Sequence, residues 1–597
     1  MQHEIRNIAI IAHVDHGKTT LVDQMFRQSG QFREGEQIEE RLMDNLDLER
    51  ERGITITAKN CAVQWKGTKI NIVDTPGHAD FGGEVERALS MVDGAVLLVD
   101  SSEGPLPQTK FVLEKALAQH LPIIVVVNKI DRQDARPKEV LDEVYDLFID
   151  LGADDKQIEF PVVYAIGRDG IAKLSLDGEG KTLEPLFDLI LETVPPPKVH
   201  EGNFRMLVSN IGYSEFVGRL AIGRVYSGSI KKNQAAYRLG ADNKEISLKI
   251  TKIQAYSGLS IVDIDEARAG DIVILAGLEE VEIGDTFVTG DKREALPRPL
   301  IDEPTVAMRF YGNDSPFSGK EGKHVLLTRI GERLKRECLS NVSLRVEPSP
   351  EGDSFIVMGR GEFQMVILLE TMRREGFEVA VGRPEILYRE VNGERHEPIE
   401  HLIIDCAEPF VGVLTEKLSQ RKGRMVNMKS PSAGRVRLEF SIPSRGLIGY
   451  QSEFMTDTKG TGIMNSSLEG FEPYRGDFRS RFTGSLVSDR VGSSVPYALF
   501  HLEPRGRLLI TSGVDVYNGM VIGEHNRDND LYVNPCKTKK LTNIRAAGKD
   551  ESVVLTPITP LNLEQAIEFI RDDELVEITP VSIRIRKKKL PPPKTGA

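Results

Sequence analysis

A run of small, polar and basic residues follows the first apolar segment of the chain, where residues 12–19 read AHVDHGKT. Such a loop between a strand and a helix points backbone N–H groups and a helix N-terminus at a phosphate. Lys18 would supply a cation for phosphate oxygens, and Thr19 an oxygen ligand for Mg²⁺. Because the strict pattern begins with glycine and this chain has Ala12, a chance GKT in a turn is the alternative. The residues predicted to surround the phosphates are Asp15, His16, Gly17, Lys18, Thr19 and Thr20.

A second motif, DTPGH at residues 74–78, comes directly after a β-rich run. A carboxylate at the end of that strand holds Mg²⁺ through water, and Gly77 brings its backbone N–H up to a γ-phosphate. The alternative is a plain Pro-Gly turn after a buried strand. We therefore predict Asp74 as a metal ligand and Gly77 as a phosphate contact.

A third motif, NKID at residues 128–131, ends another apolar strand, at the sheet edge where ligands of parallel sheets bind. Asp131 accepts hydrogen bonds from the N1–H and the exocyclic amine of guanine, whereas adenine has no donors there. An unpaired buried carboxylate gives roughly 10⁴–10⁵-fold rejection of the wrong base. The motif predicts GTP or GDP as the nucleotide, with a solvated turn as the alternative.

Between the first two motifs lies ERGITI, residues 51–56, in a polar and charge-rich segment long enough to be a mobile loop. Thr55 would give its hydroxyl to Mg²⁺ and its N–H to the γ-phosphate, so GTP orders the loop and hydrolysis releases it. Standing alone, this run would be an ordinary lead-in to a strand. The other three motifs follow one another in the order that a GTPase requires, each at the end of a predicted strand.

The elements that position these motifs alternate between β-rich runs and amphipathic helical patterns through the first third of the chain, which predicts a mostly parallel sheet with helices on both faces. Strands are predicted at residues 5–12, 60–65, 69–74, 94–100, 122–128 and 160–164. Helices are predicted at residues 18–29, 79–91, 108–119, 137–151 and 183–193. The last helix runs into prolines 195–197, which mark a stiff linker.

The rest of the chain predicts four more domains. Residues 202–299 show short strands and glycine turns without a long helix, as in a small β-barrel. Residues 305–381 follow the order β-α-β-β-α-β of a split ferredoxin-like unit, and residues 385–474, with helices near 411–421 and 446–456, show a similar pattern. The remainder is strand-rich, with one helix at 561–571. The predicted domains are 1–198 (GTP-binding), 199–301 (β-barrel), 302–383 and 384–478 (ferredoxin-like α/β), and 479–597 (strand-rich C-terminal).

The composition is that of a soluble multidomain protein, with 597 residues, 40% of them hydrophobic and 28% charged. The longest apolar runs are far short of the ~20 residues that a membrane-spanning helix needs, and the start of the chain has no signal-peptide pattern. The four cysteines, which show no CxxC spacing, are Cys61, Cys338, Cys406 and Cys536. We expect reduced thiols, no structural zinc and a cytoplasmic protein without a membrane partner. The net charge of −13 argues against a non-specific nucleic-acid coat but not against a local basic surface.

The four motifs stand in the forms used by the translational GTPases, the group of elongation factors Tu and G, which this sequence resembles. The resemblance implies that His78 positions the attacking water within a hydrophobic gate of Val14 and Ile54, and makes His78, Lys18 and Thr55 the catalytic set. It also implies that Thr19, Thr55 and Asp74 hold Mg²⁺, and that Asn128, Lys129 and Asp131 bind guanine. A fifth guanine-side element usually reads Ser-Ala followed by Lys or Leu. Here Ala165 is followed by Ile166, which leaves only a backbone contact.

Beyond the GTPase domain, the barrel and the two α/β units resemble domains II, III and V of elongation factor G, and the whole chain resembles the BipA/TypA family. Four strings carry this resemblance: SPFSGKEGK at 315–323, RREGFE at 373–378, IPSRGLIGY at 442–450 and KKLTNIRAAGKDE at 539–551. The family implies binding near the factor site of the ribosome, a role in large-subunit assembly and growth under stress or cold. We expect a monomer.

A basic cluster near the end of the chain offers a surface for an RNA backbone. It consists of Lys537, Lys539, Lys540, Arg545 and Lys549 around Asn543. The resemblance implies that this domain contacts large-subunit rRNA and reaches toward an A-site tRNA. A solvated charged face is the alternative.

The sequence therefore predicts a ribosome-stimulated GTPase that works as a conformational switch. One alternative is a LepA-like elongation factor acting on translocation, from which the string at 539–551 distinguishes the chain. Another is a non-catalytic assembly chaperone that needs only GTP occupancy. The weakest is a metabolic P-loop ATPase.

Overall fold

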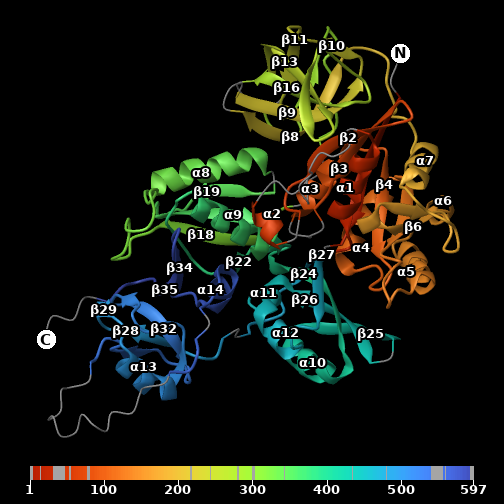
Figure 1. The fold of residues 1–597 in the computed structure, drawn as a ribbon. Coiled ribbons are helices and arrows are strands. Elements are labelled where there is room, and N and C mark those ends of the chain that lie inside the picture. Colours follow the sequence, from red (N-terminus) through yellow and green to blue (C-terminus); the bar gives the residue numbers. More distant parts are fainter. Residues whose placement is uncertain are drawn as a thin grey trace, which may run out of the picture. The chain divides into compact units, whose positions relative to one another are not determined.

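The computed structural model describes the chain in segments, which form two compact units (Figure 1). The first unit contains residues 1–302 and 337–343, and the second contains residues 303–336 and 344–597. The described residues are 4–13, 15–30, 47–52, 55–76, 81–214, 218–241, 244–278, 281–298, 303–341, 343–432, 434–478, 481–538, 555–558 and 560–591.

The first unit begins with a seven-stranded sheet in the order β2-β3-β1-β4-β5-β6-β7. Its strands are β1 Ile5–Ala12, β2 Lys59–Trp65, β3 Thr68–Asp74, β4 Gly94–Asp100, β5 Ile123–Asn128, β6 Val162–Ile166 and β7 Ile171–Lys173. The five strands from β3 to β6 run parallel, and the outer strands β2 and β7 are antiparallel to their neighbours. The mostly parallel sheet is as predicted, and it places the carboxyl ends of β1, β3 and β5 along one edge.

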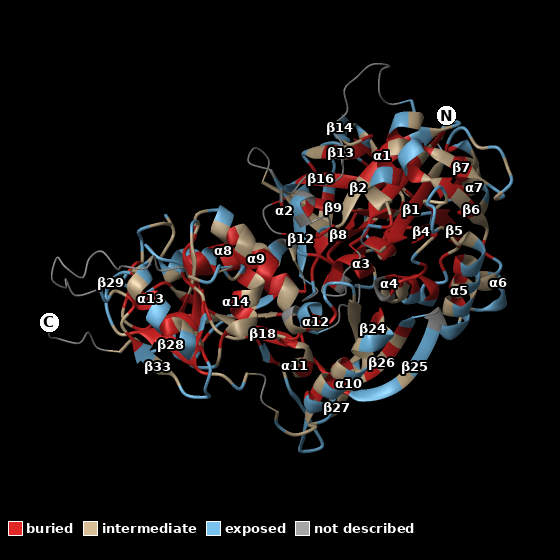
Figure 2. Ribbon diagram, turned by 60° about the horizontal axis from the view of Figure 1, so that its bottom comes forward, coloured by how far each residue is buried: buried red, intermediate tan, exposed pale blue. Residues whose placement is uncertain are grey.

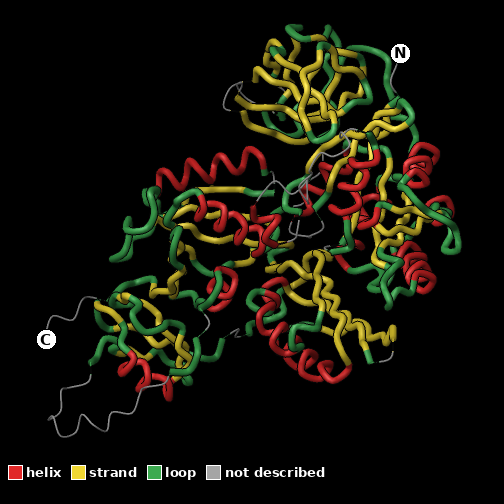
Figure 3. The backbone as a smooth tube through the Cα atoms, in the orientation of Figure 1, coloured by secondary structure: helices red, strands yellow, loops and turns green. Residues whose placement is uncertain are grey.

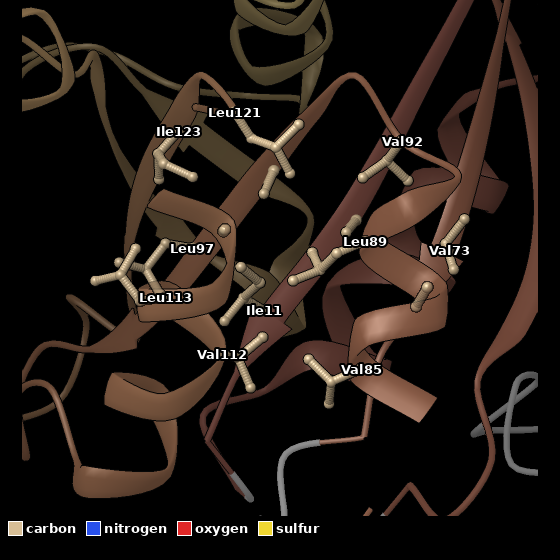
Figure 4. Close-up of a cluster of buried hydrophobic side chains, with 14 of the residues drawn as sticks. Ile11, Val73, Val85, Leu89, Val92, Leu97, Val112, Leu113, Leu121 and Ile123 are labelled. Carbon is tan, nitrogen blue, oxygen red and sulfur yellow. The ribbon is translucent and has the colours of Figure 1, made fainter. Parts of the chain in front are cut away.

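Helices cover both faces of this sheet, and its strands are buried (Figure 2). They are α1 Lys18–Gln28, α3 Gly82–Ser90, α4 Pro107–Ala118, α5 Pro137–Asp150, α6 Asp155–Ile158 and α7 Glu184–Thr193. Successive side chains of a strand point to opposite faces. In β1, Ile8 and Ile10 join the cluster that includes α1 and α7, whereas Ala9 and Ile11 join the cluster that includes α3, α4 and α5. Figure 4 shows side chains of α3 and α4 meeting those of the sheet in this second cluster.

The β-barrel domain follows in the same unit, drawn as strands and loops in Figure 3. Eight strands form a sheet in the order β12-β11-β17-β8-β9-β16-β13-β14, and β10 pairs with β15. The bounds are β8 Arg205–Ser214, β9 Gly218–Ser227, β10 Ser229–Lys231, β11 Ala235–Leu239, β12 Glu245–Lys249, β13 Lys252–Ser257, β14 Ser260–Ile264, β15 Glu266–Arg268, β16 Ile272–Leu278 and β17 Thr286–Val288.

The barrel packs directly on the parallel sheet's domain. Ile274 of the barrel belongs to the same buried cluster as α3 and α4. Lys69 Nζ lies 2.8 Å from Asp271 Oδ1, and Arg224 donates to Asp93 Oδ1 over 2.7 Å. All four of these side chains are largely buried. The two domains therefore share one hydrophobic cluster, and buried ion pairs lie at the same interface.

The second unit begins with a ferredoxin-like domain whose strands pair in the order β19-β20-β18-β21. Its elements are β18 Val306–Gly312, α8 Leu327–Ser340, β19 Arg345–Pro348, β20 Ser354–Gly359, α9 Glu362–Arg374 and β21 Val379–Val381, with β22 Glu385–Ile386 beside β18. The chain order β-α-β-β-α-β is as predicted.

The next domain repeats this arrangement with longer strands, in the order β23-β24-β26-β25 with β27 on β24. Its elements are β23 Arg389–Val391, β24 Glu394–Ala407, α10 Val411–Gln420, β25 Arg424–Ser432, β26 Arg435–Pro443, α11 Ser444–Leu447, α12 Gln451–Asp457 and β27 Ile463–Pro473. The single helix predicted over 446–456 is divided, because Gly449 between α11 and α12 has a φ of +71°. A residue in this left-handed region ends a helix.

The C-terminal domain is strand-rich, as predicted, but contains two short helices where the sequence predicted one. Its elements are β28 Ser485–Ser488, β29 Gly492–Ser493, α13 Pro496–Leu502, β30 Gly506–Leu508, β31 Asp515–Val516, β32 Met520–His525, β33 Leu531–Val533, α14 Leu563–Phe569, β34 Glu574–Ile578 and β35 Ile583–Lys587. Asn562 and Gln565 form a reciprocal capping box at the start of α14. The unpredicted helix α13 starts at Pro496, a favourable first position.

The C-terminal strands continue the first ferredoxin-like sheet. β34 pairs antiparallel with β21, with Val379 opposite Ile578 and Val381 opposite Val576. The combined sheet therefore runs β19-β20-β18-β21-β34-β35-β32-β28-β33. Chain order alone does not predict this pairing, because the second α/β domain lies between the two strands in the sequence.

A buried carboxylate organises the loop at this junction. Glu378, which has no exposed surface, accepts hydrogen bonds through Oε2 from the backbone N–H of Gly319 (2.9 Å) and from Asn313 Nδ2 (3.0 Å). Its Oε1 accepts from the N–H groups of Glu321 (3.0 Å) and Gly322 (2.6 Å). The strings at 315–323 and 373–378 therefore meet at one carboxylate.

The same loop, residues 313–322, also contacts the hairpin of β34 and β35. The carboxylate of Glu321 accepts from Arg584 and from Thr579 Oγ1, one on each oxygen. Asn313 Nδ2 also donates to Glu577 of β34 over 3.2 Å. These contacts cross from the ferredoxin-like domain to β34 and β35 and reinforce the pairing of β21 with β34.

In the part of the chain that the structure describes, no helix is both long enough and apolar enough to span a bilayer.

Candidate functional site

The phosphate loop follows β1 and opens α1. Gly17 is the N-cap of α1 with a φ of +94°, and a Cβ added there would lie 2.6 Å from Asn128 Nδ2. Both the backbone conformation and the space therefore require glycine. Since Gly17 has no side chain to cap the helix, the first N–H groups of α1 are available to an anion.

The cation and the carboxylate predicted for phosphate and metal meet beside this loop. Lys18 Nζ lies 2.6 Å from Asp74 Oδ1 and donates to the carbonyl of Thr75 over 2.5 Å. The Asp74 side chain is 3% exposed. Thr75 Oγ1 donates to the Ile10 carbonyl over 2.8 Å, which ties the end of β3 to β1. The edge of the sheet thus holds Lys18 and Asp74 in direct contact.

Asn128 connects the base-side motif to the phosphate loop. Its Nδ2 donates to the His16 carbonyl over 2.9 Å, and its Oδ1 accepts from the Gly167 N–H over 2.8 Å. Lys129, with a φ of +60°, donates from Nζ to the Asp15 carbonyl over 2.6 Å. These bonds fasten three separate loops to one another at the carboxyl end of β5.

Asp131 stands at the open side of this arrangement. Its side chain is 35% exposed, and Oδ2 lies 3.5 Å from the NH2 group of Arg168, which is itself 77% exposed. Ala165 is buried at the end of β6, and its carbonyl accepts from the Ile130 N–H over 3.4 Å. The carboxylate is therefore accessible to a base, and Ala165 is bonded to Ile130, the residue before it; the backbone contact of Ala165 and Ile166 with a base stays a prediction.

His16 supports the loop from the sheet side. The imidazole is fully buried, with Nδ1 3.4 Å from the Leu98 carbonyl and Nε2 3.6 Å from Glu103 Oε2. The proximity of His16 lowers the pKa of Glu103 against the opposing effect of burial. A phosphate would therefore meet the backbone of His16 rather than its ring.

The segment before Thr55 contains a six-residue helix, α2 Asp47–Arg52, where the sequence predicted a loop. Glu49 of this helix is fully buried, and its Oε1 accepts from the N–H groups of Ile56 (2.9 Å) and Thr57 (3.3 Å). Glu49 also forms an ion pair with Lys59 at the start of β2. This anchor joins α2 to residues 56, 57 and 59, and Thr55 is only 7% exposed.

Several predicted residues lie outside the described ranges: Val14, Ile54, Gly77, His78, Lys539, Lys540, Asn543, Arg545 and Lys549. Of the described positions, Thr19 is half-buried at the start of α1, Thr20 is exposed, and Lys537 is exposed. Thr19 and Thr20 begin the same helix as Lys18, so all three share the phosphate-loop end of α1.

Known families match nearly every domain. Residues 3–196 match the elongation factor Tu GTP binding domain, 218–288 its domain 2, 394–482 the elongation factor G C-terminus, and 483–592 the TypA/BipA C-terminal domain. Proteins named large ribosomal subunit assembly factor BipA are similar over almost the whole chain. The protein from Synechocystis sp. is 51% identical over 98% of each chain, and that from Escherichia coli K12 is 50% identical over 99% of this chain and 98% of its own. The chain belongs to the TypA/BipA family.

Family membership confirms the predicted fold class and the enzyme class. This TypA/BipA chain is a translational GTPase with a guanine-nucleotide-binding domain of the elongation factor Tu type. The match of residues 483–592 favours it over the LepA-like alternative. A crystal structure from Thermus thermophilus shares the fold, with a TM-score of 0.54 and 16% identity over 79% of this chain and 97% of that one.

The structure of this TypA/BipA chain adds site residues that the motifs did not indicate. Gly167 donates to Asn128, and Ser101 donates from its N–H to the Asn128 carbonyl over 2.9 Å. Asp100 lies at the end of β4, directly opposite Asn128 in the register of β4 and β5. A signal for Asp100 was present in the sequence, because it ends a buried strand at the same edge as the motifs.

Proposed function

We propose that this chain is a ribosome-stimulated GTPase that acts as a conformational switch in assembly of the large ribosomal subunit. GTP orders the segments that carry Thr55 and Asp74, the ordered state binds the ribosome, and hydrolysis to GDP and phosphate releases it. The names of the relatives, large ribosomal subunit assembly factor, support the partner and the process.

One observation carries the nucleotide part of this proposal. A single sheet edge holds Lys18 against Asp74 and joins Asn128 to the phosphate loop through the His16 carbonyl. Lys18 binds phosphate oxygens, and Asn128, Lys129 and Asp131 bind the guanine. A phosphate-side cation and a base-side carboxylate on one edge of a parallel sheet support a purine nucleotide as the ligand.

The donor set also fits Mg²⁺. Buried Asp74 Oδ1 has Lys18 as its ion partner but accepts no hydrogen bond from the described residues. Thr19 and Thr55 add hydroxyl oxygens, which with phosphate oxygens and water make the hard ligand set that Mg²⁺ prefers. Bound there, the ion would neutralise charge on the β- and γ-phosphates. Thr19, Asp74 and Thr55 are the proposed ligands.

Hydrolysis requires a positioned water and charge stabilisation. We assign the water to His78 and the hydrophobic gate to Val14 and Ile54, on the strength of the family motifs. Lys18 stabilises charge on the transferred phosphoryl group, and Thr55 closes the site. Intrinsic turnover is then slow until the ribosome aligns these groups.

The RNA-binding part of the proposal concerns the end of the chain. The basic residues from Lys537 to Lys549 contact large-subunit rRNA and the acceptor end of an A-site tRNA through phosphates. The protein acts as a cytoplasmic monomer, in keeping with a ribosomal partner. This assembly step would then limit the growth rate of the cell under stress or in the cold.

The deciding experiment measures GTP hydrolysis by the full chain with and without purified ribosomes. We expect strong stimulation by ribosomes, and His78→Ala should abolish it with little loss of GTP binding. Unchanged turnover in the presence of ribosomes contradicts the switch, and equal loss of binding and turnover contradicts the role of His78.

Two further comparisons separate the alternatives. A non-hydrolysable GTP analogue should hold the protein on the ribosome, whereas equal release with GTP and analogue favours a non-catalytic chaperone. Calorimetry should show GTP and GDP bound far more tightly than ATP. If ATP binds as tightly as GTP, Asp131 does not select guanine.

A further inference from the structure

Asp100 is a fully buried carboxylate at the carboxyl end of β4. Parallel pairing of β4 with β5 sets Asp100 opposite Asn128, so its side chain lies at the sheet edge that carries the base-side motif. None of the nucleotide motifs includes it. A buried charge is costly unless it is paired and hydrogen-bonded, so its partners show what it holds in place.

The two oxygens of Asp100 have separate partners. Oδ1 accepts from the N–H of Ser102 (2.8 Å) and from its hydroxyl (2.7 Å). Oδ2 lies 2.8 Å from Lys129 Nζ and 3.5 Å from Arg132. Burial opposes ionisation of Asp100, but the bonds from Lys129 and Ser102 outweigh it and lower its pKa to about 2. The carboxylate is therefore ionised at neutral pH.

Lys129 divides its ammonium group between two acceptors. Nζ contacts Asp100 Oδ2 and donates to the Asp15 carbonyl of the phosphate loop over 2.6 Å. The side chain keeps 30% of its surface exposed, so its stem is open to a base. Arg132 is a weaker partner of Asp100, because it also pairs with Asp134 and is 39% exposed.

The residue after Asp100 holds the backbone of the same motif. Ser101 donates from its N–H to the Asn128 carbonyl and from Oγ to the Lys129 carbonyl, both over 2.9 Å. Lys129 needs this support, because its φ of +60° is uncommon for a residue with a side chain. The loop after β4 thus fixes both the backbone and the ammonium group of Lys129.

We propose that Asp100 is a positioning residue for guanine nucleotide binding, which acts through Lys129 to hold the base-side loop against the phosphate loop. It touches neither base nor phosphate. The inference rests on the proposed role of Lys129 in the nucleotide site and adds Asp100 as the residue that orients the Lys129 side chain.

Asp100→Asn keeps the size of the side chain and an oxygen for Ser102 but removes the charge that attracts Lys129. We expect the dissociation constants of GDP and GTP both to rise about tenfold or more, the scale of coupling between contacting charged residues. Their ratio should stay unchanged, because Lys129 lies on the base side and does not sense the γ-phosphate. Turnover at saturating GTP should stay within about twofold of the parent chain.

The test is a double-mutant cycle in the full chain, with Asp100→Asn, Lys129→Met and the double variant, read by stopped-flow release of a fluorescent GDP analogue. If Asp100 acts through Lys129, Asp100→Asn adds little to Lys129→Met. Asp285→Asn is the matched control. Asp285 is also fully buried and pairs with Arg238 (2.8 Å) and Arg298 (2.6 Å), but in the barrel. It should lower thermal stability and leave GDP release unchanged.

The outcomes separate this inference from the proposed function. If Asp100→Asn weakens GDP binding equally in the parent chain and in Lys129→Met, or does not weaken it at all, the positioning role is overturned. Faster GDP release in Asp285→Asn assigns the effect to general destabilisation and also overturns it. Unchanged GDP affinity in Lys129→Met contradicts the proposed nucleotide site itself.

Discussion

Replacing Glu378 with glutamine should destabilise the second unit far more than a surface charge change would. The two carboxylate oxygens accept four hydrogen bonds, from Asn313 and from three backbone N–H groups of residues 319–322. Glutamine keeps one acceptor oxygen and turns an NH₂ group toward two of these donors. Two of these donors then lose this acceptor, and the backbone N–H groups among them are part-buried.

The magnitude follows from those two donors. A buried donor without a partner costs about 1–3 kcal/mol, and part-buried donors fall at the low end of that range, so the substitution should cost about 2–3 kcal/mol. That is a large share of the ~5–15 kcal/mol that holds a domain folded. Relief by movement is limited, because a Cβ at Gly322 would lie 2.5 Å from the Glu378 side chain, which shows how closely the loop approaches.

The chain provides its own way to tell the two units apart. Its one tryptophan is Trp65, in β2 of the first unit. Urea unfolding followed by far-UV circular dichroism reports both units, whereas Trp65 fluorescence reports the first. We expect Glu378→Gln to move a dichroism transition to lower urea and to leave the fluorescence transition in place.

Glu375→Gln is the matched control. Glu375 pairs with Arg333 near the same loop, but its side chain is 38% exposed, so its loss should cost no more than about 1 kcal/mol. Equal shifts for the two variants, or a cost below about 1 kcal/mol for Glu378→Gln, would refute the reasoning.

The dependence of stability on acid pH gives a second test of the role of Glu378. Burial tends to raise the pKa of Glu378, but the hydrogen bonds from Gly319, Asn313, Glu321 and Gly322 outweigh it and hold the pKa below its usual value. A lowered folded-state pKa gives stability above the unfolded pKa of ~4.3, which is lost as the pH falls through the folded-state pKa. Glu378→Gln should therefore be less sensitive to acid than the parent chain, and an unchanged acid dependence contradicts this.

Three other substitutions test the first unit. Gly17→Ala should weaken GDP and GTP binding by at least about tenfold, because its Cβ would meet Asn128 Nδ2 at 2.6 Å; normal affinity in calorimetry contradicts the loop geometry. Glu49→Gln should slow GTP turnover and leave GDP affinity unchanged, because it loosens the segment at Ile56 beside Thr55. Turnover is measured in single-turnover experiments and affinity by GDP titration. Equal effects on turnover and affinity count against a role of Glu49 in holding this segment. Arg224→Met should cost about 3–5 kcal/mol of unfolding free energy, since it leaves Asp93 largely buried without its ion partner, and a change below about 1 kcal/mol in urea unfolding argues otherwise.

The sequence predicted those features whose signals are local. AHVDHGKT lies in one short run that links a strand to a helix, and NKID ends a strand of six consecutive buried residues. Both the residue type and the element are then readable from a few neighbours. The apolar run of β1 likewise predicted a strand, and the structure buries its residues on both faces of the sheet.

Contacts between distant segments left no such signal. Gly167 donates to Asn128 through a backbone N–H, which any residue except proline could supply, so residue type does not reveal it. Helix α2 was predicted as loop because its run of charges has no apolar face. Two of its residues, Leu48 and Glu49, are buried, and the partners of Glu49 follow it in the chain.

The pairing of β21 with β34 is the clearest case of a feature that sequence order hides, and it has a consequence for how the C-terminal domain moves. The chain leaves the ferredoxin-like domain after β22, builds the domain from β23 to β27, and returns to the first sheet through β34. Because backbone pairing, Asn313 and Glu321 all cross this junction, a movement of the ferredoxin-like domain carries β34 and β35 with it. Among its described strands, β23 to β27, the intervening domain shares none with that sheet. A movement of the ferredoxin-like domain therefore reaches the C-terminal domain through the shared sheet, although the two are not consecutive in the chain.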